Sequence, residues 1–385
     1  MKYIKKFFKG LIVLLLLAIA LLYITDYDYI LKAVRTIYLK GHITAYLEDY
    51  KEFDNRTLTT GAPSPWAIHK DYNSVEETER LTQTNNEYGS IAYVIIKNDS
   101  IWFENYYDKF DKDSKTNSFS MVKSMISAML GKAIMEGHIK SLEQPVSDFF
   151  PEFSEGLAAK MTVGDLSSMA SGTNWDEAYY SPFSITTRAY FDDNLAKVIL
   201  GLKVIHEPGQ AYKYASGDTQ LLAMIIEKAT GKTLTTYLSD SFWKPLGAEN
   251  EALWQLDSED GGLEKAFCCL ASNARDFARF GKLYKDFGKW RGKQLLDSSF
   301  VVKSVTPRFP ESPMYGYGWW LHTFKSKSFF MMRGHLGQYV IVEPDDNIMI
   351  IRLGHQDSDD EGDSKFTSDI DIYIEEAYQM LGMPL

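Results

Sequence analysis

Segments typical of β-strands lie near both ends of this chain, separated by a long region of helix and loop patterns. Ser90–Lys97 (SIAYVIIK) and Ser100–Tyr107 (SIWFENYY) are rich in β-branched and aromatic residues, and the Asn98-Asp99 pair between them is typical of a hairpin turn. Strand-like segments return near the C-terminus, at Tyr315–His322, Ser328–Gly334, Gln338–Pro344 and Asn347–Gly354. Segments this far apart can share a layer only if the two chain ends meet. The pattern therefore predicts an α/β (α+β) fold with a mostly helical region, roughly residues 116–260, inserted between them.

The sequence divides into three parts. Residues 1–25 form an apolar segment, residues 26–66 a linker with mixed helical spacing that we expect to pack near the membrane, and residues 67–385 the main domain. Amphipathic helices are predicted within the main domain at Thr219–Gly231, at Ala274–Gly288 and at the C-terminus.

The first residues have the charge pattern of an export signal. Four lysines within residues 2–9 precede the unbroken apolar run Leu11–Ile24, and two aspartates follow it. This asymmetry predicts a cytoplasmic N-terminus and an extracytoplasmic body. The apolar run continues past Ala18 and Ala20, the candidate cleavage residues, which favours an uncleaved membrane anchor formed by residues 7–24. The alternative is secretion after cleavage of a signal peptide.

The composition excludes several classes of partner and cofactor. A net charge of −11 and a pI near 5.2 argue against nucleic acid as a partner, since phosphate binding needs clustered Lys and Arg. The seven histidines show no paired ligand spacing, so we expect no metal and no other cofactor. Bridges between adjacent cysteines are rare, so Cys268 and Cys269 are expected to be two small buried side chains at the start of a helical segment. The acidic run Asp357–Ser364 is predicted to be a solvated loop.

Ser118–Leu130 (SFSMVKSMISAML) predicts a buried helix with a polar stripe. Its apolar residues surround most of the helix, whereas Ser120, Lys123, Ser124 and Ser127 share one narrow face. Burial of such a helix lowers the pKa of a lysine, and a lysine one turn from a serine can activate that serine as a nucleophile. From this segment alone, the better interpretation is that Ser120 caps the helix and that the Lys123 side chain reaches solvent.

A second Ser-x-x-Lys, at Ser241–Lys244, is the weaker candidate. Pro245 follows it directly, and a proline disfavours helical backbone at the residue before it. We therefore do not expect Ser241 and Lys244 to lie on one helical turn.

Two further motifs support a functional role for the first Ser-x-x-Lys, Ser120–Lys123. Tyr214-Ala215-Ser216 stands just before a long amphipathic helix, and His335-Leu336-Gly337 stands between two late strands. In this order, Ser-x-x-Lys, Tyr-x-Ser and His-x-Gly resemble the motifs of the serine β-lactamase and penicillin-binding protein superfamily. The resemblance is to its class C-like branch, especially to the 6-aminohexanoate-dimer hydrolases and family VIII carboxylesterases. It implies a β-lactamase/transpeptidase-like fold, an antiparallel sheet flanked by helices.

The resemblance also implies roles for individual residues. Ser120 would be the acylated nucleophile, Lys123 its proton partner, and Tyr214 a general base whose phenolate Lys123 favours. The backbone N–H groups of Ser120 and Gln338 would form the oxyanion hole. Residues expected to bind substrate are Ser216, His335 and Gly337 from the motifs, with Trp175 and Tyr179 as aromatic walls of the pocket.

Departures from the superfamily pattern bear on the substrate. His335 replaces the lysine of the Lys-Thr-Gly motif, and Ser216 replaces an asparagine. Both changes favour an ester or amide over a β-lactam antibiotic. The sequence thus predicts an exported serine hydrolase that acts on a small ester, amide or peptide-like substrate. The alternatives are a cell-wall DD-peptidase or β-lactamase-like enzyme, and a penicillin- or peptidoglycan-binding sensor that is acylated without turnover.

Overall fold

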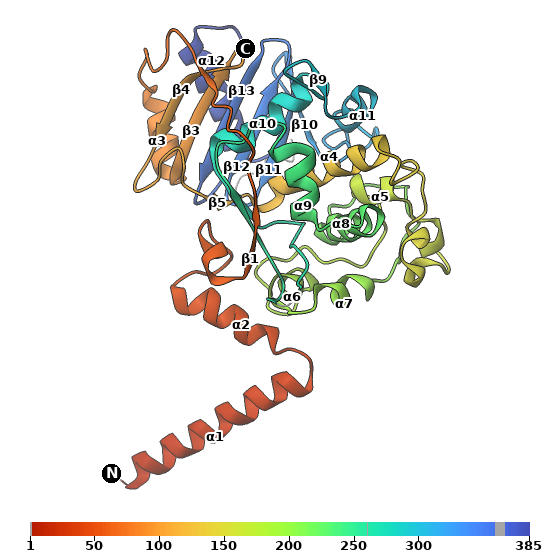
Figure 1. The fold of residues 1–385 in the computed structure, drawn as a ribbon. Coiled ribbons are helices and arrows are strands. Elements are labelled where there is room, and N and C mark those ends of the chain that lie inside the picture. Colours follow the sequence, from red (N-terminus) through yellow and green to blue (C-terminus); the bar gives the residue numbers. More distant parts are fainter. Residues whose placement is uncertain (1, 260, 359–365) are drawn as a thin grey trace.

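The computed structural model describes residues 2–259, 261–358 and 366–385 (Figure 1). The helices are α1 (Lys2–Ile24), α2 (Tyr29–Thr36), α3 (Glu79–Glu87), α4 (Val122–Met135), α5 (Val163–Ser167), α6 (Ile185–Phe191), α7 (Leu195–Leu200), α8 (Ser216–Thr230), α9 (Leu234–Leu238), α10 (Ala274–Lys285), α11 (Ser298–Ser304) and α12 (Ser368–Leu381). The strands are β1 (Asn55–Leu58), β2 (Ala67–Ile68), β3 (Ser90–Lys97), β4 (Ser100–Tyr106), β5 (Thr116–Asn117), β6 (Ala252–Gln255), β7 (Leu270–Ser272), β8 (Lys289–Trp290), β9 (Lys293–Gln294), β10 (Trp320–Phe324), β11 (Lys327–Gly334), β12 (Gln338–Glu343) and β13 (Ile348–Gly354). Most of the acidic run expected as a solvated loop, residues 359–364, lies outside the described residues.

The larger sheet is assembled from both ends of the main domain, as predicted. Within the described residues its strand order is β10-β11-β12-β13-β3-β4-β2, and all neighbours are antiparallel except the edge pair β2 and β4. Strand β13 pairs with β3 across the middle, with Ile350 opposite Ile95. The β3–β4 hairpin turns at Asn98 and Asp99, both in the left-handed region (φ +49° and +61°), which these residue types tolerate best after glycine.

Helices cover both faces of this sheet. On β3, Tyr93 and Ile95 pack with Ile370 and Tyr373 of α12, whereas Val94 and Ile96 face the core that contains α4 and α10. Figure 1 shows α12 and α3 on one side of the sheet and α4 and α10 on the other. Because both faces are buried, the central strands are apolar at nearly every position instead of alternating with polar residues.

A smaller sheet corrects the predicted nature of the linker. Its strand order is β1-β6-β7-β5, and β1 pairs antiparallel with β6. The segment 26–66 is therefore helical only in its first part, because residues 55–58 are extended by pairing with Ala252–Gln255, far away in the sequence. The four residues of β1 show no alternation of apolar and polar side chains from which a strand could have been predicted.

Two local predictions were wrong. Cys268 and Cys269 are bridged by a disulfide and lie just before β7, so they are neither free nor at a helix start, although both are buried. Lys244 has helical backbone despite Pro245 (φ −65°, ψ −52°), because it follows a π-helical turn formed by Ser239–Trp243. Its side chain pairs with Asp240 at the surface, so this second Ser-x-x-Lys does not form a site with Ser241.

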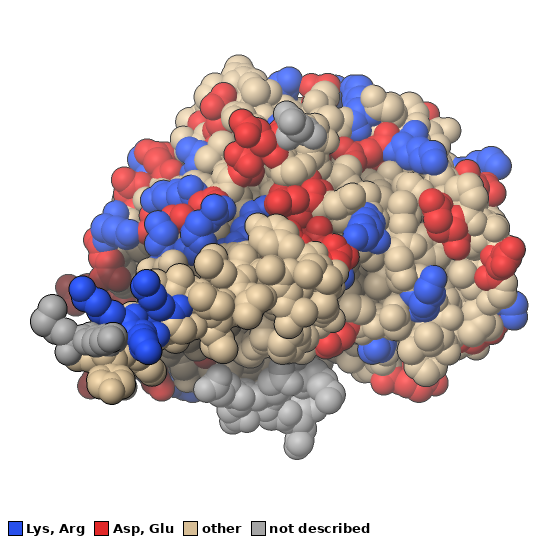
Figure 2. Space-filling model, turned by 90° about the horizontal axis from the view of Figure 1, so that it is seen from below, with Lys and Arg blue, Asp and Glu red and all other residues tan. Residues whose placement is uncertain are grey.

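The N-terminal helix α1 extends away from the rest of the chain (Figure 1). Tyr3–Ile24 is long and apolar enough to cross a membrane: its most apolar 18-residue window has a mean hydropathy of 2.7, and none of that window is buried against the protein. Figure 2 shows its lysines gathered at the free end, with the remaining visible surface of the helix uncharged. A membrane anchor and a signal sequence share these properties.

Arg352 on β13 holds the turn between β11 and β12. It is fully buried, and its guanidinium donates to the carbonyls of Leu336 (3.2 Å), Gly337 (2.8 Å) and Gln356 (2.9 Å). Two further bonds reach the Tyr88 carbonyl and the Ser90 hydroxyl. A guanidinium offers five N–H donors in one plane, so a single side chain fixes three separate segments.

Replacing Arg352 with methionine should destabilise the fold strongly. The apolar side chain fits a buried position but leaves five oxygens without their charged donor, which we expect to lower the free energy of unfolding by about 3 kcal/mol or more. Urea denaturation measures this directly. Arg35→Met, at an exposed position of α2, should change the free energy by less than about 0.5 kcal/mol. Equal effects of the two substitutions would contradict this role.

Candidate active site

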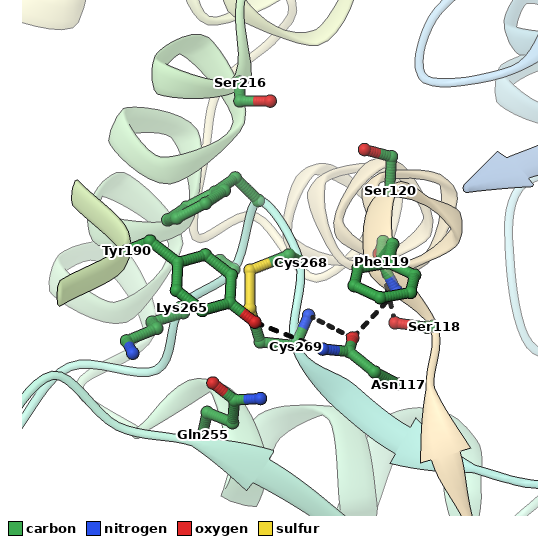
Figure 3. The surroundings of a disulfide bond; sticks show 12 residues. Asn117, Ser118, Phe119, Ser120, Tyr190, Ser216, Gln255, Lys265, Cys268 and Cys269 are labelled. Atoms are coloured by element: carbon green, nitrogen blue, oxygen red, sulfur yellow. Dashed lines mark hydrogen bonds between the residues drawn. A yellow bond between two sulfur atoms is a disulfide. The ribbon is translucent and has the colours of Figure 1, made fainter. Parts of the chain in front are cut away.

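The turn that carries Ser120 is held in an unusual conformation. Ser120 lies in a short 3₁₀ turn, Phe119–Met121, that leads from β5 into α4. Phe119 has φ +44°, a strained value for a bulky residue. The Asn117 side-chain oxygen accepts the N–H of Phe119 (2.9 Å) and that of Cys269 (3.2 Å), as Figure 3 shows. Asn117 thus ties the turn that carries Ser120 to the disulfide-containing segment.

Lys123 lies one helical turn after Ser120 and is buried. Its Nζ donates to Ser120 Oγ (2.7 Å) and to the Phe267 carbonyl (2.6 Å), and the residue is 3% exposed. Burial lowers the pKa of Lys123 to about 8, and the Glu177 carboxylate opposes that shift in part. A fraction of Lys123 is therefore neutral near pH 7, as a proton acceptor for Ser120 must be. The structure thus places Lys123 against Ser120 and not at the surface.

Tyr214 completes the cluster, but as a neutral phenol. Its ring centroid lies 5.2 Å from Lys123 Nζ, and its hydroxyl interacts with that of Ser120. Burial and the nearby Glu177 carboxylate raise the pKa of Tyr214 well above its usual value, which outweighs the opposite effect of Ser120. The expected phenolate is therefore disfavoured. Of the two partners of Ser120, Lys123 is the one whose pKa lies near neutrality.

Glu177 is a central residue that the sequence interpretation missed. Its carboxylate accepts hydrogen bonds from Trp175 Nε1 (2.6 Å), Tyr179 OH (2.8 Å) and both the N–H (2.8 Å) and the hydroxyl of Ser216. It also acts electrostatically on Lys123 and Tyr214. The loop around Trp175 contains no periodic pattern, and its contact with Ser216 forms only in the folded chain.

These bonds change the roles expected for two residues. Trp175 is 1% exposed, and its ring packs so closely on α8 that a Cβ at Gly217 would lie 2.3 Å from it. It is therefore a core residue and not a wall of the pocket. Ser216 lines the apolar pocket at Ser120, as expected, but it is buried and its hydroxyl is directed to Glu177, so it also positions that carboxylate. Tyr179, in contrast, lies in the pocket as predicted.

The edge of the site is formed by Gly334 and His335, which corrects two assignments. A Cβ at Gly334 would lie 2.4 Å from the Ser118 carbonyl and 3.3 Å from Ser120 N, so only glycine permits this approach. Gly337 belongs to the turn (φ +77°) and faces Arg352. Gln338 is paired with Gly334 in the sheet, and its side-chain amide donates a hydrogen bond to the Gly354 carbonyl. Neither Gly337 nor Gln338 lines the pockets at Ser120.

His335 lies at the site in its neutral form. Burial lowers its pKa to about 4, and its Nε2 is buried without a hydrogen-bond partner among the described residues. Its ring contacts those of Tyr179 and Phe119, with centroids 5.1 and 5.6 Å away.

The two remaining serines of the polar stripe have structural roles. Ser124 Oγ donates to the Gly318 carbonyl and Ser127 Oγ to the Tyr317 carbonyl, both at 2.6 Å. They anchor the segment before β10 across α4. Here Gly318 has φ +80° and its position allows no side chain, which explains why the strand predicted from Tyr315 begins only at Trp320.

Ser120 lies where two pockets of different character meet. Tyr179 and His335 line both. The apolar pocket extends from Ser120 to Ile30 and Ala33 of α2, to Ile37 directly after it, and to Tyr190 and Phe191 of α6. The polar pocket extends to Tyr214, Arg333, Asp357 and Thr367. A reacting carbonyl at Ser120 would therefore have one substituent in each environment.

Comparison with known proteins identifies several relatives. A family model described as Beta-lactamase matches residues 76–372. The 6-aminohexanoate-dimer hydrolase of Paenarthrobacter ureafaciens is 25% identical over 298 residues, which cover 71% of this chain and 74% of that protein. The solved structure described as "Putative 6-aminohexanoate-dimer hydrolase from Bacillus anthracis" superposes with a TM-score of 0.70 at 20% identity, covering 87% of this chain and 93% of that one. A family VIII carboxylesterase superposes with a TM-score of 0.59 at 16% identity, covering 80% and 99%. These matches confirm the resemblance and the fold expected from the motifs.

Glu177→Gln should lower the pKa of Lys123. The Glu177 charge raises that pKa, so its removal should move the deprotonation of Lys123 from about 8 to a lower pH. NMR titration of ¹³C-labelled lysine side chains measures the midpoint. Asp176→Asn, at the exposed neighbouring position, should leave the midpoint unchanged. An unchanged or raised midpoint in Glu177→Gln would show that this coupling is absent.

Proposed function

Because this chain belongs to the beta-lactamase family and is a serine hydrolase, we propose that it cleaves an ester or amide through an acyl-enzyme on Ser120. The single observation that carries the proposal is the 2.7 Å hydrogen bond between Ser120 Oγ and a buried lysine whose pKa is about 8. A lysine in this state accepts the serine proton as the hydroxyl attacks.

The first half of the reaction follows from these positions. Neutral Lys123 takes the proton of Ser120 as Oγ attacks the carbonyl carbon, and about one tenth of Lys123 is neutral at pH 7. The backbone N–H groups of Ser120 and His335 stabilise the oxyanion, because Gly334 brings the end of β11 against the Ser120 turn. Tyr214, protonated and beside Ser120, donates its proton to the leaving alcohol or amine and regains one from Lys123.

The second half uses the same groups in reverse. Water enters from the side of the departed leaving group, loses its proton to the Lys123–Tyr214 pair and attacks the acyl carbon. The products are the carboxylic acid and free Ser120. Glu177 adjusts the pKa of Lys123 and, together with Ser216, positions Tyr179 at the pocket.

The charges at the pocket bear on the class of substrate. His335 is neutral and so supplies no cation for a substrate carboxylate, which favours an ester or simple amide. Arg333 in the polar pocket is the observation in favour of a second candidate, a peptide or β-lactam that carries a carboxylate.

The uncharged part of α1, preceded by lysines, supports export and anchoring by residues 7–24. Membrane fractionation tests this, and full-length protein in the cytosolic fraction would contradict it.

Ser120→Ala should abolish hydrolysis of p-nitrophenyl acetate, lowering kcat at least about 10³-fold. Lys123→Met and Tyr214→Phe should each cost about 10²–10⁴-fold, as acid–base groups do. Ser241→Ala, in the second Ser-x-x-Lys, is the matched control and should retain full activity. Unchanged turnover in Ser120→Ala would disprove the mechanism. Stable labelling of Ser120 by a fluorescent penicillin, without ester turnover, would support the sensor instead.

The pH profile tests which group is the base. If neutral Lys123 accepts the proton, kcat/KM should rise with pH, with a midpoint near 8, because raising the pH through that value deprotonates the amine. Glu177→Gln should shift this limb to lower pH, in parallel with the NMR midpoint. A flat profile between pH 6 and 9 would show that Lys123 is not the base.

A further inference from the structure

The apolar pocket at Ser120 contains no charged side chain. Among the described residues that line it, none is Lys, Arg, Asp or Glu, and the titratable His335 is neutral because burial lowers its pKa to about 4. Its lining combines aliphatic side chains of and just after α2 and aromatic side chains of α6 with a few uncharged hydroxyl groups, those of Thr44, Ser181, Thr186, Thr187 and Ser216. An apolar group is stabilised in such a pocket by leaving water, whereas a charged or strongly polar group would lose its hydration without compensation.

The wall formed by α2 is firmly attached to the body of the protein. The helix packs against α6, with Ala33 and Ile37 buried. Tyr29 OH donates to the Pro182 carbonyl (2.9 Å), and Lys32 Nζ donates to the Asp257 carbonyl (3.1 Å). The pocket is therefore a built part of the fold, formed jointly by the linker and the main domain.

This wall follows α1 directly. Helix α1 ends at Ile24 and α2 begins at Tyr29, so only four residues separate the apolar N-terminal helix from the pocket wall. In Figure 1, α2 lies between α1 and the rest of the protein. If α1 is in a bilayer, the far end of the pocket lies close to the bilayer surface. Ile43, which lines the same pocket, is 72% exposed there.

The proton donor determines which side of the substrate lies in this pocket. Tyr214 lines the polar pocket and not the apolar one. The leaving group must receive its proton from the Tyr214–Lys123 pair, so it occupies the polar pocket, beside Arg333 and Asp357. The other substituent of the reacting carbonyl, the acyl chain, then points into the apolar pocket.

We propose that the substrate is an ester or amide of a long-chain carboxylic acid with a polar leaving group, and that its acyl chain occupies the apolar pocket against α2. This assignment rests on the proposed acyl-enzyme mechanism. Ser120 Oγ forms a bond to the acyl carbon, and the bond from that carbon to the leaving oxygen or nitrogen breaks. The leaving group departs with the proton from Tyr214, and water then releases the long-chain acid and restores the Ser120 hydroxyl.

The experiment compares acyl chain lengths on the full chain in lipid nanodiscs. p-Nitrophenyl esters of two, four, eight and ten carbons share one leaving group, so only the acyl chain varies. Burial of a methylene favours binding by up to about fourfold, so kcat/KM of the wild type should rise at least tenfold between the two- and eight-carbon esters.

Two substitutions test the pocket itself. Ala33→Phe fills its far end, and Ile43→Asp puts a charge at an exposed lining position where folding is not at risk. Each should lower kcat/KM at least tenfold on the eight-carbon ester and less than twofold on the two-carbon ester. Val34→Phe is the matched control, because Val34 lies on the same helix but is 37% exposed and does not line the pocket; it should behave as wild type on both esters.

The outcomes separate the two proposals. A wild-type kcat/KM that is flat or falls with chain length, or pocket variants that affect both esters equally, would overturn the acyl-pocket assignment while Ser120→Ala still abolishes turnover. Turnover that persists in Ser120→Ala would instead overturn the mechanism on which the assignment rests.

Discussion

The burial of one lysine side chain is the constraint on which the site depends. Lys123 belongs to α4, whose other faces are packed in the core, and among the residues that the structure describes its amine has the Ser120 hydroxyl and the Phe267 carbonyl as its hydrogen-bond partners. Desolvation lowers its pKa to about 8. An amine fixed in this way has a pKa close to neutrality and is directed at the Ser120 hydroxyl, which a surface lysine would not be.

Keeping that lysine buried requires close contacts from distant segments. Phe267 directly precedes the Cys268–Cys269 bridge. The Asn117 side chain accepts hydrogen bonds from the backbone N–H groups of Cys269 and Phe119, and so links this bridge to the strained turn. From the other side, Gly334 at the end of β11 allows the larger sheet to reach the same turn. Ser120 is thus held where the two sheets meet, and Arg352 fixes the hairpin that carries His335.

The surroundings of Ser120 divide the substrate into two parts. Polar groups lie on the side of Tyr214, and an uncharged pocket lies on the side of α2. Because α2 follows the apolar N-terminal helix after four residues, the linker is part of the pocket as well as a spacer. One short helix thus connects the pocket at Ser120 with the apolar N-terminal helix.

Local patterns were enough to predict much of this protein. The limits of β3, the assembly of one sheet from both chain ends and the helix of Ser120 follow from side-chain period and turn chemistry, which act over a few residues. Lys123 and Tyr214 were singled out by the family resemblance that the three motifs carry. The tertiary structure alone decided the rest. It brought Glu177 to Ser216, buried Trp175 against Gly217, and placed Gly334 instead of Gly337 beside Ser120. It also made α2 a wall of the pocket and paired β1 with β6. These contacts join segments far apart in the sequence, and they are set by which surfaces pack together, a property that no local pattern contains.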